Sequence, residues 1–336
     1  MAIRAEDLES LEERLCCLAR EDHRARVHPD MLDHQRRDIL ANAISNVLST
    51  ELAISTYAQI IDGLPTANVG WERRSPGLPG DHPLDEHEEL CPGSLEKSRE
   101  LCRRWTLDVL WFNPKTLSAF RSARPGTKAF NTRLIELVAV SLHQFGALLF
   151  QLGFRLHKGD IDSVVKWEMP RPAIIDPKNW FVLPPRPTIF NHPLYLHDDI
   201  YPEGVADIVG YWAEDRILGA VVVFDRAAEF DDHGNQVENP PNAYFHPCRT
   251  GVTERVTQLR DDQQQELIDF LLAKYNGPVT PCSLPILVDK RNTVRVDADV
   301  AITLHGIYRD LWERVPLTED EMEALARRPQ QEIDYP

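Results

Sequence analysis

The sequence lacks most of the short motifs that assign a protein to a class. Its six cysteines include no Cys-x-x-Cys pair and no spacing typical of a zinc site, so we expect reduced structural thiols and no bound metal. There is no Walker A motif, no Gly-x-Gly-x-x-Gly fingerprint and no Gly-x-Ser-x-Gly elbow. ATP binding, dinucleotide binding and α/β-hydrolase chemistry therefore have no motif support.

Signals for export and for membrane insertion are also missing. The chain begins MAIRAEDLESLEERL, which is charged and contains no apolar stretch of the kind found in secretory signals. The longest apolar stretch, residues 134–156, approaches membrane-spanning length, but it carries Glu136, His143, Gln144, Gln151 and Arg155. We expect a buried helix there, and a cytoplasmic protein without membrane contact.

Negative charge is in excess. The chain has 53 acidic and 37 basic residues, a net charge of −16, and a hydrophobic fraction of 43% that is typical of a globular protein. A net charge of this sign repels polyanions at long range, which argues against DNA binding. RNA or another phosphate-bearing partner would need a local basic surface.

Helical periodicity dominates the first half of the chain. Apolar residues recur at helical spacing from residue 6 to about residue 63, which predicts two helices joined near His28-Pro29. Residues 64–93 are rich in proline and glycine and predict a long loop. Helices are predicted again from Ser94, as an N-cap, and over residues 130–156.

The second half is rich in proline, β-branched and aromatic residues. Strands are predicted in VVKWEM, WFVL, GVADIVGYWA, RILGAVVVFD, AYFHP and GVTERVTQL, and residues 216–225 and 244–259 predict an antiparallel meander around a surface loop at 226–241. Helices are predicted over 261–275, 304–312 and 318–328. The sequence thus predicts an α+β fold, with a helical half over residues 1–157 packed against an α+β half over residues 158–336 that carries a small antiparallel sheet.

The densest group of reactive side chains lies in residues 191–204, NHPLYLHDDIYPEG. Prolines and a glycine bracket it, which predicts a loop of the kind that carries functional sites. The candidate catalytic residues are His192, His197, Asp198, Asp199 and Glu203. The alternative interpretation is a solvated acidic turn with two hydrogen-bonded histidines.

His197-x-Asp199 also has the spacing of two ligands of the iron(II)/2-oxoglutarate oxygenases. His246 would be the third ligand, and Arg255 would hold the 2-oxoglutarate carboxylate. Two observations weaken this alternative: a second His-x-Asp occurs at residues 28–30, and few strands are predicted between Asp199 and His246.

Carboxylates continue beyond the loop. Asp207, Glu214 and Asp215 lie on or beside predicted strands and make an acidic neighbourhood that would suit a cationic substrate such as a guanidinium. With His246 and Arg255 they are the candidate substrate-binding residues. For any one of them, an outward-facing solvated side chain is the more common outcome.

Cations without neighbouring acids lie in residues 113–134. The stretch contains no aspartate or glutamate, and its five cations are Lys115, Arg121, Arg124, Lys128 and Arg133. They form a candidate contact for a phosphate group or an RNA backbone. The alternative is a basic face paired with acidic surface elsewhere.

The block HPLYLHDDIYPEGVADIVGYWAEDRILGAVVVFDR, with a looser extension at 244–256, resembles a group of fungal proteins associated with natural-product pathways. Within that group it is most similar to the arginine-containing cyclodipeptide synthases. The resemblance covers about a tenth of the chain. It implies an enzyme of secondary metabolism, an aminoacyltransferase that uses aminoacyl-tRNA and no cofactor. A third hypothesis, from another class, is a non-catalytic interaction protein.

Overall fold

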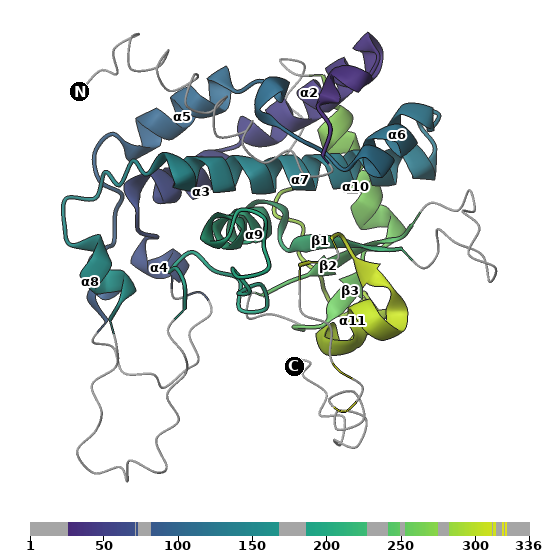
Figure 1. Ribbon diagram of the computed structural model, residues 1–336. Coiled ribbons are helices and arrows are strands. Elements are labelled where there is room, and N and C mark those ends of the chain that lie inside the picture. Colours follow the sequence, from purple (N-terminus) through teal and green to yellow (C-terminus); the bar gives the residue numbers. More distant parts are fainter. Residues whose placement is uncertain are drawn as a thin grey trace.

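The protein is described here by a computed structural model. It describes residues 26–70, 72, 82–167, 186–226, 241–248, 253–274, 282–310, 312–313, 318 and 320. The long helix α7 passes through the centre of the molecule, with α2 and α5 above it in Figure 1 and with α9 and the sheet below it.

The fold is α+β, as predicted. The described helices, in which η marks a short 3-10 helix, are η1 (Pro29–Met31), α2 (His34–Leu48), α3 (Glu51–Asp62), α4 (Ala67–Gly70), η2 (Pro83–Glu86), α5 (Ser94–Arg104), η3 (Leu107–Val109), α6 (Pro114–Ser122), α7 (Lys128–Leu152), α8 (Ile161–Val165), α9 (Val205–Leu218), α10 (Asp261–Leu272) and α11 (Ala298–His305). The strands are β1 (Val221–Asp225), β2 (Ala243–His246), β3 (Val256–Gln258), β4 (Arg295–Val296) and β5 (Ile307–Tyr308).

The N-terminal helices are more divided than the periodicity predicts. Helix α3 follows α2 after a break at Ser49, because the Thr50 hydroxyl caps α3 by accepting a hydrogen bond from the Ala53 N–H at 3.1 Å. The predicted loop at 64–93 contains the short elements α4 and η2. Ser94 is the first residue of α5, and Gly93 occupies the cap position. The helix predicted before residue 28 lies outside the described residues.

Helix α7 confirms the predicted buried helix. Among the described residues it is the one helix long and apolar enough to cross a membrane, and 78% of its apolar window is buried inside the fold. The core helix of a soluble protein passes the same test of length and composition. Because the helix packs against protein, Glu136 and His143 have polar partners within the fold although they lie in an apolar run.

The strand predicted over residues 204–213 is wrong, because this segment forms α9. All of its residues except Val205 and Arg216 are buried. A helix that is buried on every side has no polar face, so its sequence lacks the periodicity by which helices are recognised. Burial also encloses three carboxylates, those of Asp207, Glu214 and Asp215.

The predicted meander is confirmed. Strand β1 pairs antiparallel with β2, and β2 with β3, so that Val222 lies opposite Phe245 and Phe245 opposite Thr257. The strand order is β4-β3-β2-β1-β5. Residues 227–240 of the predicted surface loop lie outside the described residues, as does the WFVL segment.

The remaining predictions have mixed outcomes. Helix α10 confirms the prediction over 261–275. The helix predicted over 304–312 is wrong. Helix α11 ends at His305 because Gly306 adopts a left-handed conformation (φ 61°), and β5 follows. The predicted strand VVKWEM begins inside helix α8. Most of the helix predicted over 318–328 lies outside the described residues.

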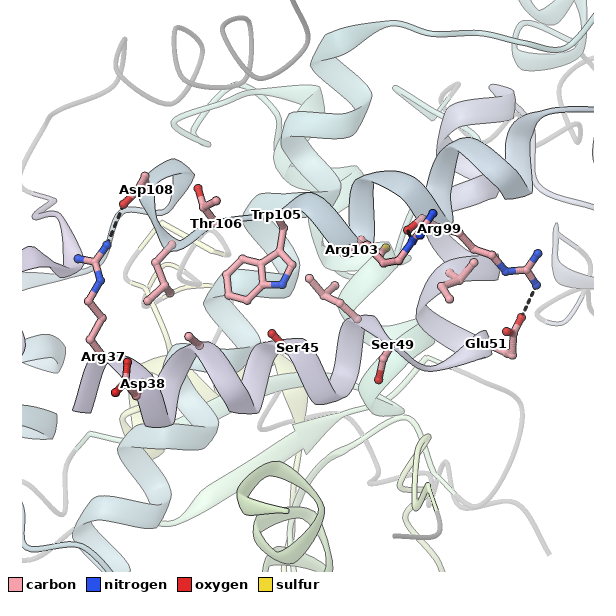
Figure 2. A pocket seen from close by; sticks show the side chains of 15 residues that line it. Arg37, Asp38, Ser45, Ser49, Glu51, Arg99, Arg103, Trp105, Thr106 and Asp108 are labelled. Carbon is pink, nitrogen blue, oxygen red and sulfur yellow. Dashed lines mark hydrogen bonds and ion pairs between the residues drawn. The ribbon is translucent and has the colours of Figure 1, made fainter. Parts of the chain in front are cut away.

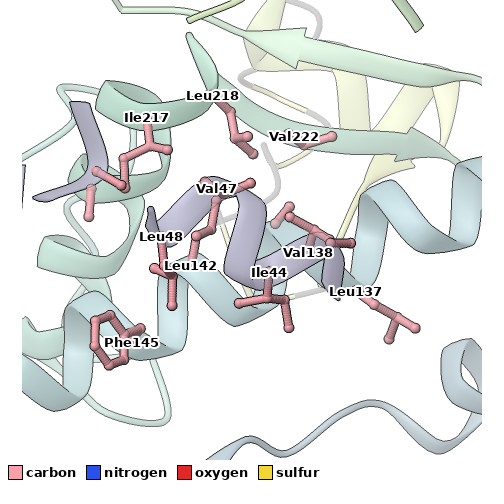
Figure 3. Packing of buried hydrophobic residues seen from close by; sticks show 14 of the residues in the cluster. Ile44, Val47, Leu48, Leu137, Val138, Leu142, Phe145, Ile217, Leu218 and Val222 are labelled. Carbon is pink, nitrogen blue, oxygen red and sulfur yellow. The ribbon is translucent and has the colours of Figure 1, made fainter. Parts of the chain in front are cut away.

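One hydrophobic core spans both halves of the chain. In Figure 3, side chains of α2, α7, α9 and β1 meet, among them Ile44, Val138, Ile217 and Val222. Two glycines let α7 and α9 approach closely. A Cβ on Gly210 would lie 2.7 Å from the His143 carbonyl oxygen, and one on Gly146 would lie 3.0 Å from the Cβ of Ala213.

Candidate functional site

The loop before α9 does not gather its predicted catalytic residues. His197 and Asp199 are exposed, and Asp198 is half-buried. Glu203 turns toward α7, where its Oε2 accepts a hydrogen bond from the Gln151 side chain at 2.9 Å. The exposed part of this loop therefore matches the solvated-turn interpretation.

The two buried histidines beside this loop are hydrogen-bonded within the fold. His192 donates from Nε2 to the His246 carbonyl oxygen at 3.1 Å, and its Nδ1 accepts from the Leu194 N–H at 3.2 Å. His246 Nδ1 lies 3.0 Å from the Tyr195 hydroxyl. His192 lies in one group with Asp215 and Cys248, but both of its ring nitrogens are engaged.

The predicted iron triad is not assembled. Within the described part of the chain, His197, Asp199 and His246 do not form a group that offers ligand atoms to one point. His246 is fully buried, whereas the other two are exposed. Arg255 is half-buried beside β3, and its backbone N–H donates to the Thr253 hydroxyl.

Asp207 belongs to a buried pair that the sequence does not indicate. Its Oδ1 lies 2.8 Å from Nε2 of His143 on α7, and its Oδ2 accepts from the Glu203 N–H at 2.8 Å. Burial alone would raise the pKa of Asp207, but the hydrogen bonds and charge of His143 outweigh it and lower the pKa below its usual value. The carboxylate therefore stays ionised and fixes a proton on Nε2 of His143.

Glu214 is occupied by a guanidinium of the chain itself. Arg309 donates to both of its oxygens, at 2.8 and 2.7 Å, and the Val222 N–H donates to Oε1 at 2.8 Å. Burial alone would lower the pKa of Arg309, but Glu214 holds it well above its usual value. A guanidinium substrate therefore cannot bind Glu214 in this conformation, because Arg309 already does so.

A cavity of about 100 Å³ lies between α7, α9 and the segment after β5. It is lined by His143, Asp207, Tyr211, Arg309 and other side chains, including Asn113 and Thr116 at the start of α6. His143 is 7% exposed, and its Nδ1 has no hydrogen-bond partner in the described structure. Glu214 Oε2 lies 3.9 Å from that nitrogen.

Glu136 forms the other charged centre of this cavity. Arg133 and Arg226 each contact its carboxylate at 2.6 Å, and the Thr116 hydroxyl donates to it at 2.9 Å. Burial alone would raise the pKa of Glu136, but Arg226 and Arg133 lower it to about 2. Arg133, predicted to contact phosphate, is therefore a buried partner of Glu136.

The other four predicted phosphate contacts are exposed on and after α6. They are Lys115, Arg121, Arg124 and Lys128. Lys128 donates to the Asn242 side chain at 2.7 Å, and no described carboxylate forms an ion pair with any of the four. Four of the five predicted phosphate contacts are therefore exposed, and their role stays a prediction.

A second groove in the described surface lies elsewhere, between α2 and α5. Figure 2 shows Trp105 in this groove of about 560 Å³, with the ion pairs Arg37–Asp108 at 2.8 Å and Arg99–Glu51 at 2.9 Å beside it. Its charged side chains pair with one another near solvent. The smaller cavity at His143 is the better candidate site, because it is lined by a buried histidine whose Nδ1 has no hydrogen-bond partner in the described structure.

Comparisons with family models, with curated proteins and with solved structures found no match to this chain.

Proposed function

We propose that this chain is a small-molecule biosynthetic enzyme in which His143 is the general base. One observation carries the proposal: a buried histidine, oriented by a carboxylate, presents an unpartnered nitrogen beside a cavity. Base catalysis by histidine uses this arrangement: one ring nitrogen donates its proton in a hydrogen bond to a carboxylate, and the other can accept a proton.

The hydrogen bond to Asp207 decides which nitrogen of the His143 ring can act as the acceptor. Asp207 holds the proton of Nε2, so the lone pair of the neutral ring is on Nδ1. Once Nδ1 accepts a proton, the positive ring lies 2.8 Å from the Asp207 carboxylate and 3.9 Å from that of Glu214. The cavity of about 100 Å³ has room for the reacting groups of a substrate, and the rest of the substrate would extend beyond it.

The reaction that we favour is the aminoacyl transfer implied by the sequence resemblance. The amine of one aminoacyl group would attack the ester carbonyl of another, giving its proton to His143. A peptide bond forms, the ester C–O bond breaks, and the proton passes to the departing ribose oxygen. Helix α6 supports this assignment, since its first turn lines the cavity while its exposed cations could hold an RNA backbone.

Replacing His143 with glutamine is expected to reduce product formation by about 10²–10⁴-fold, because glutamine cannot accept the proton. The wild-type and variant chains would be expressed in the same fungal or bacterial host, and small-molecule extracts would be compared by mass spectrometry. His305→Gln is the matched control, since His305 is exposed at the end of α11. Circular dichroism would establish that both variants are folded.

The same experiment can contradict the assignment. Product formation that persists in a folded His143→Gln chain would remove His143 from catalysis. Loss of product in Asp198→Asn/Asp199→Asn, with His143→Gln unaffected, would return the active site to the predicted loop.

Charge reversal at Arg121, Arg124 and Lys128 is expected to weaken tRNA binding and to flatten its salt dependence. Each phosphate contact contributes a slope of roughly −0.7 to −0.9 in a log-log plot, so three contacts account for about two to three units. Binding would be measured by filter retention at several salt concentrations. Folding should be retained because all three side chains are exposed. Absence of tRNA binding by the wild-type chain at low salt would contradict the aminoacyl-tRNA substrate.

A further inference from the structure

Four side chains with metal-binding atoms meet near the C-terminal ends of α3 and α7. They are Asp62, His87, Cys91 and His157, and their ligand atoms all lie within 4.8 Å of one another. Asp62 and His87 are buried, and the other two are half-buried. This cluster is separate from the His143 cavity and shares no residue with its lining.

Backbone contacts bring the cluster together from three segments. Asp62 is the last residue of α3, and the chain after α7 runs beside it, with the His157 N–H donating to the Asp62 carbonyl oxygen at 2.8 Å. His87 follows η2, and Cys91 lies just before α5. Main-chain hydrogen bonds therefore fix the segments of Asp62, His157 and His87, the last through the Ala67 N–H, which donates to the His87 carbonyl oxygen at 2.7 Å.

Asp62 and His87 each have one side-chain atom that is already hydrogen-bonded to a neighbouring group. Asp62 Oδ1 accepts from the Cys91 N–H at 3.0 Å and from the Ser94 hydroxyl at 2.9 Å. His87 Nδ1 lies 2.9 Å from the Pro65 carbonyl oxygen, which can only accept, so Nδ1 carries the proton. Such bonds orient metal-binding carboxylates and histidines.

The other polar atoms of the same two ligands face each other: Asp62 Oδ2 is an acceptor, and so is Nε2 of a neutral His87 ring. Asp62 Oδ2 and His87 Nε2 lie 3.0 Å apart, yet neither makes a hydrogen bond to any described residue. Both atoms are buried, and leaving two acceptors unsatisfied side by side is costly. A cation placed between them and the other two ligands would satisfy both.

Three of the six distances between the ligand atoms are close to those around a tetrahedral zinc ion. Bonds of about 2.0 Å to nitrogen or oxygen and about 2.3 Å to sulfur place N and O ligands about 3.3 Å apart, and S and N ligands about 3.6 Å apart. Asp62 Oδ2 lies 3.0 Å from His87 Nε2 and 3.6 Å from His157 Nδ1. Cys91 Sγ lies 3.5 Å from His157 Nδ1.

We infer that Asp62, His87, Cys91 and His157 bind one zinc(II) ion. A set of one sulfur, two imidazole nitrogens and one carboxylate oxygen suits zinc, whereas calcium and magnesium prefer oxygen ligands throughout. Four protein ligands fill a tetrahedral ion and leave no position for substrate. The ion therefore acts as a cross-link that joins the ends of α3 and α7 to the segment before α5.

The test begins with the metal content of the full chain, purified without a histidine tag from cells grown with zinc. Elemental analysis is expected to find about one zinc per chain. Removal by a chelator should lower the thermal midpoint by several degrees, and added zinc should restore it. Cobalt(II) added to the metal-free chain should give the intense visible absorption of a tetrahedral site and a thiolate charge-transfer band.

Ligand variants locate the ion. Cys91→Ser and His87→Gln are each expected to lose most of the bound zinc, and Cys91→Ser should also lose the charge-transfer band. Cys282→Ser is the matched control, because Cys282 is an exposed free cysteine outside the cluster, and it should retain the metal. If a variant fails to fold, cobalt titration of the chelated wild-type chain still reports the ligand set.

Three results would overturn the inference. The first is a wild-type chain that contains no zinc and takes up neither zinc nor cobalt. The second is full zinc content in both folded ligand variants. The third is zinc that is lost from Cys248→Ser and retained by Cys91→Ser, which would assign the ion to the group of His192, Asp215 and Cys248.

Discussion

Replacing Glu136 with glutamine is expected to lower the free energy of unfolding by about 3–5 kcal/mol, the usual cost of removing one partner from a buried ion pair. Glu136 is 2% exposed and contacts the guanidinium groups of Arg133 and Arg226. The amide has no charge to offset theirs. Two largely buried cations would then face each other across a neutral group.

The same carboxylate gives the stability a dependence on pH. Its pKa is lowered in the folded chain from 4.5 to about 2, so the carboxylate stabilises the fold above about pH 4.5. That contribution is lost as the pH falls through about 2, and it amounts to on the order of 3 kcal/mol. Glu136→Gln should therefore show a weaker loss of stability in acid than the wild-type chain.

Urea denaturation between about pH 7 and about pH 3 measures both effects. Glu51→Gln is the matched control, since the Glu51–Arg99 pair is exposed and such pairs contribute roughly 0–1 kcal/mol. If Glu136→Gln is no less stable than Glu51→Gln at neutral pH, the buried charged centre does not stabilise the fold as inferred.

Replacing Gly210 with alanine is expected to destabilise the fold by about 1–3 kcal/mol and to reduce activity, because the added methyl overpacks the α7–α9 contact. Its Cβ would lie 2.7 Å from the His143 carbonyl oxygen and 2.8 Å from an atom of the His143 ring. The helices must separate, or the ring must leave its position against Asp207. Either movement disturbs the proposed base.

Gly146→Ala provides the comparison on the facing helix. Its Cβ would lie 3.0 Å from the Cβ of Ala213, and it stays farther from backbone atoms, so we expect a smaller cost. Thermal unfolding and product formation would be measured for both variants. Equal stability and activity of Gly210→Ala and the wild-type chain would show that the crossing tolerates a wider separation.

The sequence predicts the elements whose pattern is visible along one stretch of chain. The meander of β1, β2 and β3 was predictable from β-branched and aromatic runs, and α7 from its apolar length. Helix α9 was not, because burial on every side removes the polar face that distinguishes a helix. The division between α2 and α3 depends on one cap, Thr50, within a continuous helical pattern.

The candidate sites depend on contacts between distant residues. His143 lies within an apolar run, and nothing near it in the sequence indicates its pairing with Asp207, 64 positions away. The carboxylates of α9 were predicted to bind a guanidinium substrate, but Glu214 binds Arg309 of the chain itself and Asp207 binds His143. For the proposed zinc site, the one local signal is His87-x-x-x-Cys91, while Asp62 and His157 lie on distant segments.

The two outer strands of the sheet, β4 and β5, are only two residues long. An outer strand presents unpaired backbone groups to which another chain can add, and short or charged outer strands limit such addition. Here each edge offers few groups, and β4 begins with an arginine, Arg295. Self-association by strand addition should therefore be disfavoured, which would help the protein to remain dispersed when it is concentrated.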